Sequence, residues 1–341
     1  MMKKKVAILL SGGVDSTYAA YLLKDKGFFL EGFYLKLHSN RKKHEEAMEK
    51  LNEISKNLNI KVHIIDLKKE FEEKIYNYFI NSYKEGLTPN PCALCNPTIK
   101  FGLALEKALD FGCEYIATGH YAKVENGYIY EAKDKNKDQS YFLFGLKDEA
   151  KKRIIFPLGD LSKDEVKDEA FAKLPWIGLL NEYKDSQDVC FIEDSYIDFL
   201  KEYINVDAPG IVVNKDGKNI GTHQGYMHYT IGKRKGFRVD GAHEPHYVLS
   251  TNPKANEIVV GKKYELEKMS IKAKNFSLGK DFKDGVYEIK ARYRSQKTKA
   301  FVSLNGDFIT AKLDEPIFGV APGQALVIYD ESKVLGGGFI V

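Results

Sequence analysis

The sequence Val6-Ala7-Ile8-Leu9-Leu10-Ser11-Gly12-Gly13-Val14-Asp15-Ser16 places an apolar run directly before a glycine pair and a short polar segment. This order predicts a β-strand, a tight turn and the start of a helix. Adjacent glycines let the backbone expose its N–H groups, and the partial positive charge of a helix N-terminus attracts an anion. We therefore interpret the turn as a cradle for a pyrophosphate group.

The side chains of the turn limit its chemistry. Ser11, Ser16 and Thr17 offer hydroxyl donors, and Asp15 can position Mg²⁺ or a ribose. A Walker P-loop needs a lysine directly before its final Ser or Thr, but here that stretch holds Val14 and Asp15. Transfer of a γ-phosphate is therefore disfavoured, although a glycine pair after a strand can also be no more than a turn.

Length and composition set outer limits on the protein. The chain has 341 residues, enough for two or three domains with a real core. Its 52 basic and 48 acidic residues give a formal charge of +4, too small to identify a polyanionic partner. Because we find neither an apolar run of about 20 residues nor a signal-like segment, we expect a cytoplasmic protein without a membrane partner.

The first part of the chain alternates strand-like and helical patterns. This alternation predicts a doubly wound α/β domain around a parallel sheet, which we assign to residues 1–205. We expect strands at 6–10, 30–37, 62–67 and 115–119, and helices at 18–26, 42–58, 71–83, 101–109, 164–174 and 195–203.

Beyond Pro209-Gly210 the sequence is rich in β-prone segments and turns. Turn signals such as Lys215-Asp216-Gly217 and Asn305-Gly306 separate short strands, a spacing suited to a small barrel or sandwich. We predict a central β-rich domain over residues 206–270 and a C-terminal β-barrel over residues 271–341. Its strands are expected at 286–294, 300–304, 308–313 and 324–329.

Cysteine placement indicates chemistry rather than a disulfide scaffold. Cys92 and Cys95 form a Cys-x-x-Cys pair in a proline-rich loop, before a helix expected from Thr98. Restricted backbone and a nearby helix start can lower the pKa of a thiol, so either sulfur is a candidate nucleophile. Cys113 follows a helix end and is interpreted as a small buried hydrophobe.

A third reactive candidate, Cys190, follows the polar stretch 185–188 and could meet the first pair in space. A structural zinc site would need a fourth ligand, and no Cys or His has matching spacing. Two further interpretations stay open: redox sulfurs that carry a transferable sulfur atom, or three thiolates that hold an iron–sulfur cluster.

With these elements in order, the chain closely resembles the tRNA-specific 2-thiouridylases, the MnmA family, over nearly its whole length. The matching stretches, besides the phosphate turn and the two cysteine loops, are Ala117–Tyr121, Asn136–Leu143, Gly221–Gly225, Ile231–Gly236, Ala291–Arg294, Pro322–Gln324 and Leu335–Gly338.

The resemblance implies an enzyme that uses ATP to replace the 2-oxygen of the wobble uridine with sulfur. Oxygen on uracil is a poor leaving group, so adenylation activates it and releases pyrophosphate, which is the anion the turn would hold. By the resemblance, the ATP-binding residues are Leu9, Leu10, Ser11, Gly12, Gly13, Val14, Asp15, Ser16, Leu35 and Gly119. Asp15 is also expected to be catalytic, with Mg²⁺ as a cofactor.

For sulfur transfer, the resemblance implies that Cys190 carries a persulfide and that Cys95 is the nucleophile that then closes a disulfide with Cys190. Many relatives have Asp where this chain has Cys92. As a cysteine, this residue could complete a three-thiolate site with Cys95 and Cys190, so a [4Fe-4S] cluster is a further hypothesis.

The resemblance also implies a tRNA substrate, expected to be the Lys, Glu and Gln isoacceptors, and a sulfur-donor or relay protein. RNA needs a basic, partly aromatic surface, which Lys233-Arg234-Lys235 and the basic residues around Tyr293 could supply. The implied tRNA-binding residues are Asn90, Pro91, Cys92, His120, Lys137, Asp138, Gln139, Arg292, Tyr293 and Gln324.

Two other classes remain possible from the residues. Amidotransferase-type ligases share the phosphate turn and adenylate a carbonyl, but they do not require paired cysteines. A zinc-stabilised RNA-binding protein would explain the Cys-x-x-Cys pair but would leave the phosphate turn without a function.

Overall fold

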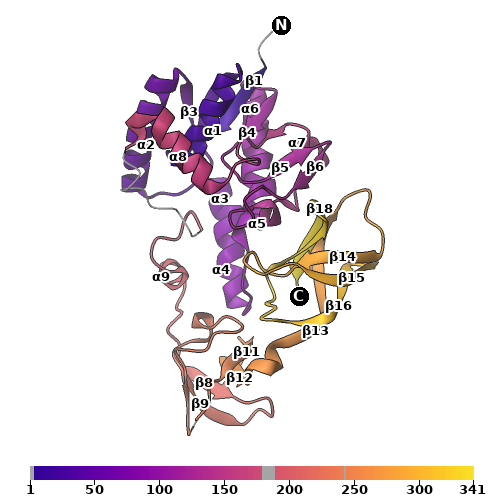
Figure 1. The fold of residues 1–341 in the computed structure, drawn as a ribbon. Helices are drawn as coiled ribbons and strands as arrows, with labels where there is room; N and C mark the ends of the chain where they lie inside the picture. The colour runs from indigo at the N-terminus through magenta and orange to yellow at the C-terminus, as the bar shows by residue number, and fades with distance from the viewer. Residues whose placement is uncertain (1–3, 179–188, 242) are drawn as a thin grey trace. The chain divides into compact units, whose positions relative to one another are not determined.

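A computed structural model describes residues 4–178, 189–241 and 243–341 (Figure 1). By its internal contacts the chain divides into two compact units. The first comprises residues 1–75, 92–187 and 332–335, and the second comprises residues 76–91, 188–331 and 336–341. The domain boundaries expected near residues 205 and 270 stay predictions.

The first unit is built on a parallel sheet of five strands in the order β3-β2-β1-β4-β7. The predicted strands 6–10, 30–37, 62–67 and 115–119 are confirmed with small shifts. The strands are β1 (Lys5–Leu9), β2 (Phe29–Lys36), β3 (Lys61–Asp66), β4 (Tyr115–Ala117) and β7 (Ile154–Ile155). Chain order reverses between β1 and β4, which makes the gap between their carboxyl ends the switch point of a doubly wound sheet.

Helices cover both faces of this sheet. On one face Val6, Ile8 and Leu10 pack against α1 (Val14–Asp25), α2 (Arg41–Leu58) and α8 (Lys163–Lys173). On the other face Phe33 contacts Phe111, which follows α6 (Ala104–Asp110). The Tyr18 hydroxyl of α1 donates to the Glu169 carboxylate of α8, and burial, reinforced by this contact, raises the pKa of Tyr18 to about 12.

Shorter strands and helices complete the α/β part and the segments beside it. The first unit also holds a short hairpin of β5 (Lys123–Glu125) and β6 (Tyr128–Tyr130), which our strand list omits. Its turn is Asn126-Gly127 with φ values of 50° and 79°, a readable hairpin signal. The remaining helical elements are α3 (Lys68–Phe71), the π-helix η1 (Glu72–Tyr76), α4 (Asn77–Lys84), α5 (Pro91–Cys95), the π-helix η2 (Asn96–Leu103), η3 (Ser140–Leu143), α7 (Asp148–Lys151), η4 (Pro175–Ile177) and α9 (Tyr196–Lys201).

The second unit contains a small sheet in the order β10-β9-β8-β12-β11. Its core is formed by Val212, Tyr229, Val248, Ile258 and Val260. The strands are β8 (Gly210–Val213), β9 (Asn219–His223), β10 (Arg238–Val239), β11 (Tyr247–Asn252) and β12 (Glu257–Gly261), with short 3₁₀ turns η6 (Tyr226–His228) and η7 (Lys263–Leu266).

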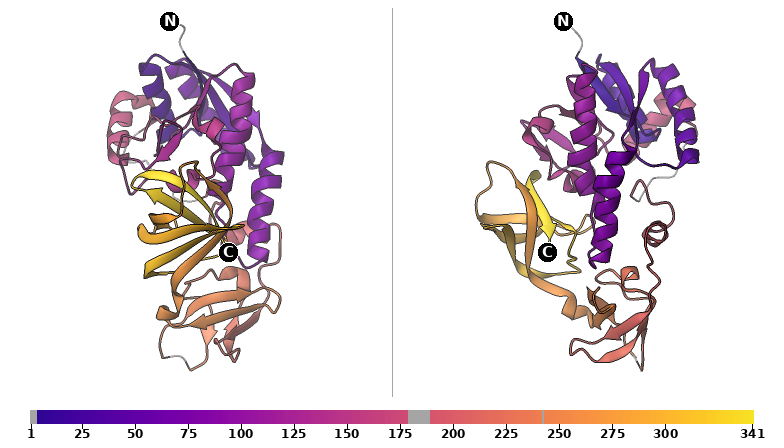
Figure 2. Two further views of the ribbon diagram at one scale, coloured as in Figure 1. Left: turned by 90° about the vertical axis from the view of Figure 1, so that its right-hand side faces the viewer. Right: turned by 180° about the vertical axis from the view of Figure 1, so that it is seen from behind.

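The C-terminal strands close into a six-stranded barrel, because β13 pairs with both β16 and β18 (Figure 2). They are β13 (Glu267–Leu278), β14 (Gly285–Lys290), β15 (Thr298–Asn305), β16 (Phe308–Phe318), β17 (Ala325–Asp330) and β18 (Lys333–Ile340). The predicted fold class, a parallel α/β domain followed by two β-rich domains with a terminal barrel, is therefore confirmed. The strand expected over 286–294 was too long, since β14 ends at Lys290.

Candidate nucleotide and sulfur-transfer site

The phosphate turn lies at the switch point of the parallel sheet. Residues 10–13 connect the end of β1 to the start of α1, and Gly13 is the N-cap of that helix with no side-chain cap. The first N–H groups of an α-helix have no acceptor within the helix, so they are available to an anion. Gly12 has φ of +80°, a conformation that favours glycine.

Hydroxyl groups stabilise the turn from inside. Ser16 Oγ and Thr17 Oγ1 donate to the Gly13 carbonyl at 3.0 and 2.9 Å, and the Ser11 N–H donates to Ser16 Oγ at 3.3 Å. Thr17 is 1% exposed and its hydroxyl donates within the turn, whereas Ser11 is exposed. Of the hydroxyls expected to bind phosphate, Ser11 is therefore the best placed.

Gly119 follows β4 and lies directly against the start of α1. A Cβ atom at this position would come within 2.8 Å of the Asp15 backbone carbon and 2.9 Å of the Ser16 nitrogen. Only glycine allows this approach, and the sheet thereby brings two predicted nucleotide residues together across the switch point. Leu35, near the end of β2, is partly buried.

Asp15 has two partners that the sequence reasoning missed. Lys163 Nζ lies 2.6 Å from Asp15 Oδ1, and the Tyr121 hydroxyl donates to the same oxygen at 2.9 Å. The Lys163 side chain is 6% exposed. A buried ammonium thus lies within hydrogen-bond distance of the acidic residue of the phosphate turn.

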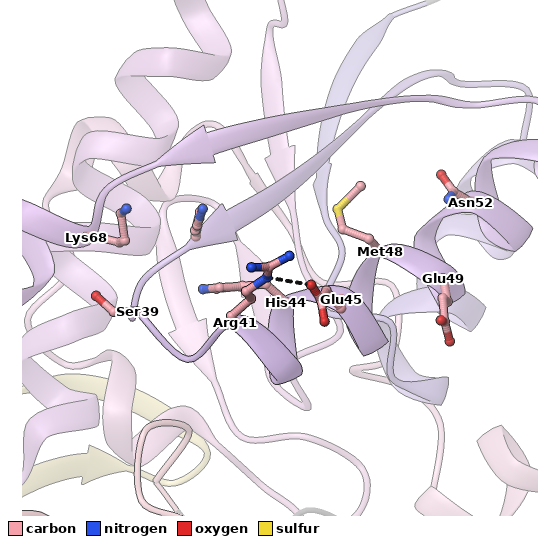
Figure 3. Close-up of a pocket in the computed structure, with 9 residues that line it drawn as sticks. Ser39, Arg41, His44, Glu45, Met48, Glu49, Asn52 and Lys68 are labelled. Atoms are coloured by element: carbon pink, nitrogen blue, oxygen red, sulfur yellow. Dashed lines mark hydrogen bonds and ion pairs between the residues drawn. The ribbon is translucent and has the colours of Figure 1, made fainter.

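A cavity of about 600 Å³ opens beyond the end of β2 (Figure 3). One of its lining residues, Lys36, directly follows Leu35 in the sequence. Two others, Arg41 and Glu45, form an ion pair at 2.7 Å. The cavity is lined by Lys36, Ser39, Arg41, His44, Glu45, Met48, Glu49, Asn52 and Lys68. This volume is in the range of sites for small molecules.

His120 lies in a hydrogen-bonded chain after β4. Thr118 Oγ1 is 2.5 Å from His120 Nδ1, and Lys100 Nζ is 3.4 Å from His120 Nε2. Desolvation, reinforced by the Lys100 charge, holds the pKa of His120 well below its usual value, so the ring is neutral at pH 7. Because an ammonium only donates, Nε2 accepts and Nδ1 carries the proton.

The stretch Lys137-Asp138-Gln139 forms a tight loop. Asp138 is 2% exposed, and its carboxylate accepts from the Ala132 N–H at 2.9 Å and Ser140 Oγ at 2.7 Å. Gln139 Oε1 accepts from the Tyr121 N–H at 2.9 Å. The tRNA contacts of all three stay predictions; Lys137 and Gln139 are both partly exposed, whereas Asp138 is buried.

Cys92 and Cys95 lie on α5, which runs into η2. The expectation that the helix starts at Thr98 is wrong: it begins at Pro91, because proline fits the first turn of a helix, where no N–H is needed. The π-helical stretch begins at Asn96-Pro97. Gly102 leaves room for the Pro97 carbonyl oxygen, because a Cβ atom at residue 102 would lie only 2.8 Å from it. Cys95 is 6% exposed and Cys92 is partly exposed.

Cys190 is exposed and lies in a turn closed by the Ile192 N–H and the Val189 carbonyl at 2.9 Å. Its neighbour Phe191 is 7% exposed and packs on Tyr76, Phe79 and Phe199, with ring centroids 4.9 to 5.4 Å apart. Residues 185–188 of the predicted polar loop lie outside the described residues. Cys190 belongs to the second unit and Cys95 to the first, and the disulfide between them stays a prediction.

The other predicted tRNA residues lie in the second unit. Asn90 and Pro91 are buried, and Arg292 and Tyr293 occupy a turn after β14 rather than the expected strand. The Arg292 guanidinium donates to the Ile231 carbonyl at 3.1 Å. Gln324 donates to the Thr88 carbonyl at 2.9 Å. Their contacts with tRNA stay predictions.

Within residues 4–178, 189–241 and 243–341, no group of three or more His, Cys, Asp or Glu side chains lies close enough to hold a metal ion. In the same part of the chain, none of the helices has both the length and the apolar character needed to cross a bilayer. Cys113, predicted to be a buried hydrophobe, is 2% exposed, and burial raises the pKa of its thiol.

Family models match the chain in three consecutive pieces. A tRNA methyl transferase HUP domain matches residues 4–194, a tRNA methyl transferase PRC-barrel domain matches residues 197–262, and an aminomethyltransferase beta-barrel domain matches residues 267–340. Among solved structures, a 4-thiouridine synthetase–RNA complex with bound ATP is 20% identical, with a TM-score of 0.33, covering 51% of this chain and 41% of that one. A TM-score this low supports no inference.

Full-length relatives are much closer in sequence. The tRNA-specific 2-thiouridylase MnmA of Helicobacter acinonychis (strain Sheeba) is 55% identical over 341 residues, covering 99% of this chain and all of the relative. The MnmA of Helicobacter hepaticus is 56% identical, covering 98% of this chain and 99% of the relative. That of Nitratiruptor sp. is 50% identical, with both chains fully covered. The chain therefore belongs to the tRNA-specific 2-thiouridylase MnmA family.

Proposed function

We propose that this chain is an ATP-dependent tRNA 2-thiouridylase that acts on the wobble uridine of the Lys, Glu and Gln isoacceptors. The observation that carries the proposal is 55% identity over 341 residues to a tRNA-specific 2-thiouridylase. The phosphate turn supports it, because a helix N-terminus without a Walker lysine suits release of pyrophosphate better than transfer of a γ-phosphate.

In the first step, the 2-oxygen of uridine attacks the α-phosphorus of ATP and pyrophosphate leaves. Residues 9–16 hold the departing diphosphate, and Leu35 and Gly119 lie beside the nucleotide. The cavity beginning at Lys36 gives room for the base or ribose. Mg²⁺ fits this site through the ATP phosphates, since it commonly binds substrate phosphates with one or two carboxylates, and Asp15 is the carboxylate in place.

In the second step, the terminal sulfur of a Cys190 persulfide attacks C2, and AMP leaves with the former carbonyl oxygen. The Cys95 thiolate then attacks the Cys190 sulfur, which breaks the S–S bond, releases 2-thiouridine and leaves a Cys95–Cys190 disulfide. A thiol reductant restores the enzyme, and a donor or relay protein reloads Cys190. The exposure of Cys190 supports access for such a protein.

A [4Fe-4S] cluster on Cys92, Cys95 and Cys190 is the alternative sulfur carrier. These thiolates are suitable iron ligands, but the described residues contain no preformed group of three ligands. No step above depends on a cluster. Anaerobic purification with iron analysis tests this alternative: full thiolation by iron-free protein excludes it.

The main test separates adenylation from sulfur transfer. Purified Cys190→Ser protein is given tRNA, ATP and a sulfide donor, and pyrophosphate, AMP and 2-thiouridine are measured. We expect tRNA-dependent pyrophosphate release to continue while 2-thiouridine, detected by mass spectrometry, is lost. The conservatively changed Cys113→Ser protein is the control for replacing a cysteine away from the site, and its product should persist.

Other outcomes would support other classes. Nucleotide cleavage that needs ammonia but no RNA would indicate an amidotransferase-type ligase, and tRNA binding without nucleotide cleavage would indicate an RNA-binding protein. The descriptions of two of the matching domains name methyl transfer, so the assay is repeated with S-adenosylmethionine. Methylated rather than thiolated RNA would refute the proposal.

A further inference from the structure

Residues 84–90 lead from α4 to the cysteine helix α5. Hydrogen bonds from η6 and β11 of the second unit hold the start of this segment. The Tyr226 hydroxyl donates to the Lys84 carbonyl at 2.8 Å, and Thr251 Oγ1 donates to the Gly86 carbonyl at 3.0 Å. The end of α4 is therefore fixed before the chain turns toward Asn90 and Pro91.

The C-terminal barrel holds the next residues of the same segment. The Thr88 N–H donates to the Pro322 carbonyl at 2.8 Å. The Gln324 amide nitrogen donates to the Thr88 carbonyl at 2.9 Å and to the Pro89 carbonyl at 3.2 Å. These three hydrogen bonds connect the start of β17 to two consecutive residues of the segment.

Gly323 allows this close contact. Its φ of +91° favours glycine, and a Cβ atom would lie 2.8 Å from the Thr88 carbonyl oxygen and 3.1 Å from the Thr88 nitrogen. The Gly323 N–H donates to the Ile340 carbonyl at 2.8 Å, which ties this turn into the barrel. Pro322, Gly323 and Gln324 thus form a rigid contact, which we name the barrel latch.

We propose that Gln324 is a positioning residue: through the barrel latch it fixes Thr88 and Pro89, and thereby the placement of Asn90 and Pro91 at the start of the cysteine helix. The hydrogen bonds of the barrel latch do not depend on the proposed function. Only the expected effect of the latch on catalysis rests on that function. A side-chain amide has two N–H donors, and here the nitrogen faces two backbone carbonyls. The amide nitrogen of Gln324 is therefore engaged in the latch, and its carbonyl oxygen can only accept a hydrogen bond.

Hydrogen–deuterium exchange of the RNA-free protein tests the latch directly. Gln324→Leu removes the two side-chain bonds, and Gly323→Ala pushes a methyl group against Thr88. We expect the peptide containing residues 84–90 to exchange roughly five- to thirtyfold faster in both variants. Gly306→Ala is the control, because Gly306 also has positive φ, at +57°, but no described atom lies within 4 Å of its Cβ position. Unchanged exchange in both latch variants would overturn the inference.

Kinetics then distinguish positioning from RNA contact. If the latch positions the segment, kcat for 2-thiouridine formation falls in both Gln324→Leu and Gly323→Ala, because both changes disturb the contact with Thr88. A weaker Kd for tRNA with unchanged exchange would make Gln324 an RNA contact and refute the proposal. The exchange result does not depend on activity, so a failure of the proposed function would leave it interpretable.

Discussion

Lys163 occupies the first position of α8, where a positive charge opposes the helix dipole. The capping box between Ser162 and Glu165 stabilises this helix start, and the Lys163 side chain turns to Asp15 instead of solvent. An ammonium that is 6% exposed is screened far less than a surface lysine. We infer that it offsets the charge of Asp15 at the turn that we propose for phosphate binding.

Replacing this ammonium should impair adenylation. In Lys163→Gln, Asp15 keeps the Tyr121 hydrogen bond but loses its positively charged partner, so its negative charge repels the nucleotide phosphates. We expect pyrophosphate release to fall roughly a hundredfold or more, as when one preorganised donor is removed from an active site. Lys133→Gln is the control, because the Lys133–Glu165 pair at 2.7 Å is about half exposed and contributes little. Equal rates in both variants would show that Lys163 has no part in the reaction.

His120 gives a pH dependence whose sign follows from its lowered pKa. The unfolded chain has a histidine pKa near 6.5, whereas desolvation and Lys100 keep the folded ring neutral well below that. The unfolded state therefore binds more protons at acid pH, and stability is lost as the pH falls through about 6.5. His120→Asn should weaken this loss, measured by thermal unfolding at about pH 7.5 and about pH 5.5. The exposed His243, changed in the same way, should leave the difference between the two temperatures unaltered.

At the scale of elements, α4 contacts the Cys190 turn and leads into the segment before the cysteine helix α5. Its side carries Phe79, which packs on Phe191 beside Cys190, and its end leads through Thr88 to Asn90. The Asn90 N–H also donates to the Tyr78 hydroxyl at 3.4 Å. One helix thus anchors the exposed Cys190 turn and the segment that precedes Cys92.

Removing the aromatic anchor should uncouple the two steps of the reaction. Phe191→Ala deletes ring contacts with Tyr76, Phe79 and Phe199, so the Cys190 turn loses its fixed position. A phenylalanine to alanine change in a core costs about 3–5 kcal/mol, and here that cost falls on local order of the turn. We expect thiolation to drop at least tenfold with pyrophosphate release retained. Phe191→Leu keeps an apolar anchor and should recover most of the product; no recovery would point to a role for the ring itself.

At the scale of the whole molecule, composition says little about the partner. A formal charge of +4 is close to balance, so we predict that local groups such as Lys137, Arg292 and the Lys233-Arg234-Lys235 loop form the RNA interface. The three family models cover the chain from residue 4 to residue 340 with short gaps. The Thr88–Gln324 bond joins residues 236 positions apart, and both residues belong to the second compact unit.

Local sequence signals were sufficient for the strand–turn–helix at Val6–Ser16, the strand and helix alternation and the β-rich second half. These features depend on neighbouring residues: apolar periodicity, glycine conformational freedom and turn chemistry act within a few positions. The helix start at Pro91 and the Asn126-Gly127 hairpin were also readable, although we assigned the first wrongly and omitted the second. The family motifs predicted individual site residues, which composition and periodicity could not do.

Only the tertiary structure shows which distant side chains contact the candidate site residues. Lys163 meets Asp15 across 148 positions, and Gln324 meets Thr88 across 236. No local pattern encodes such pairs, because each depends on which strands are neighbours in the sheet and where the barrel closes. The chain alone therefore indicates the candidate reacting groups, while the packing of distant segments sets their partners and position.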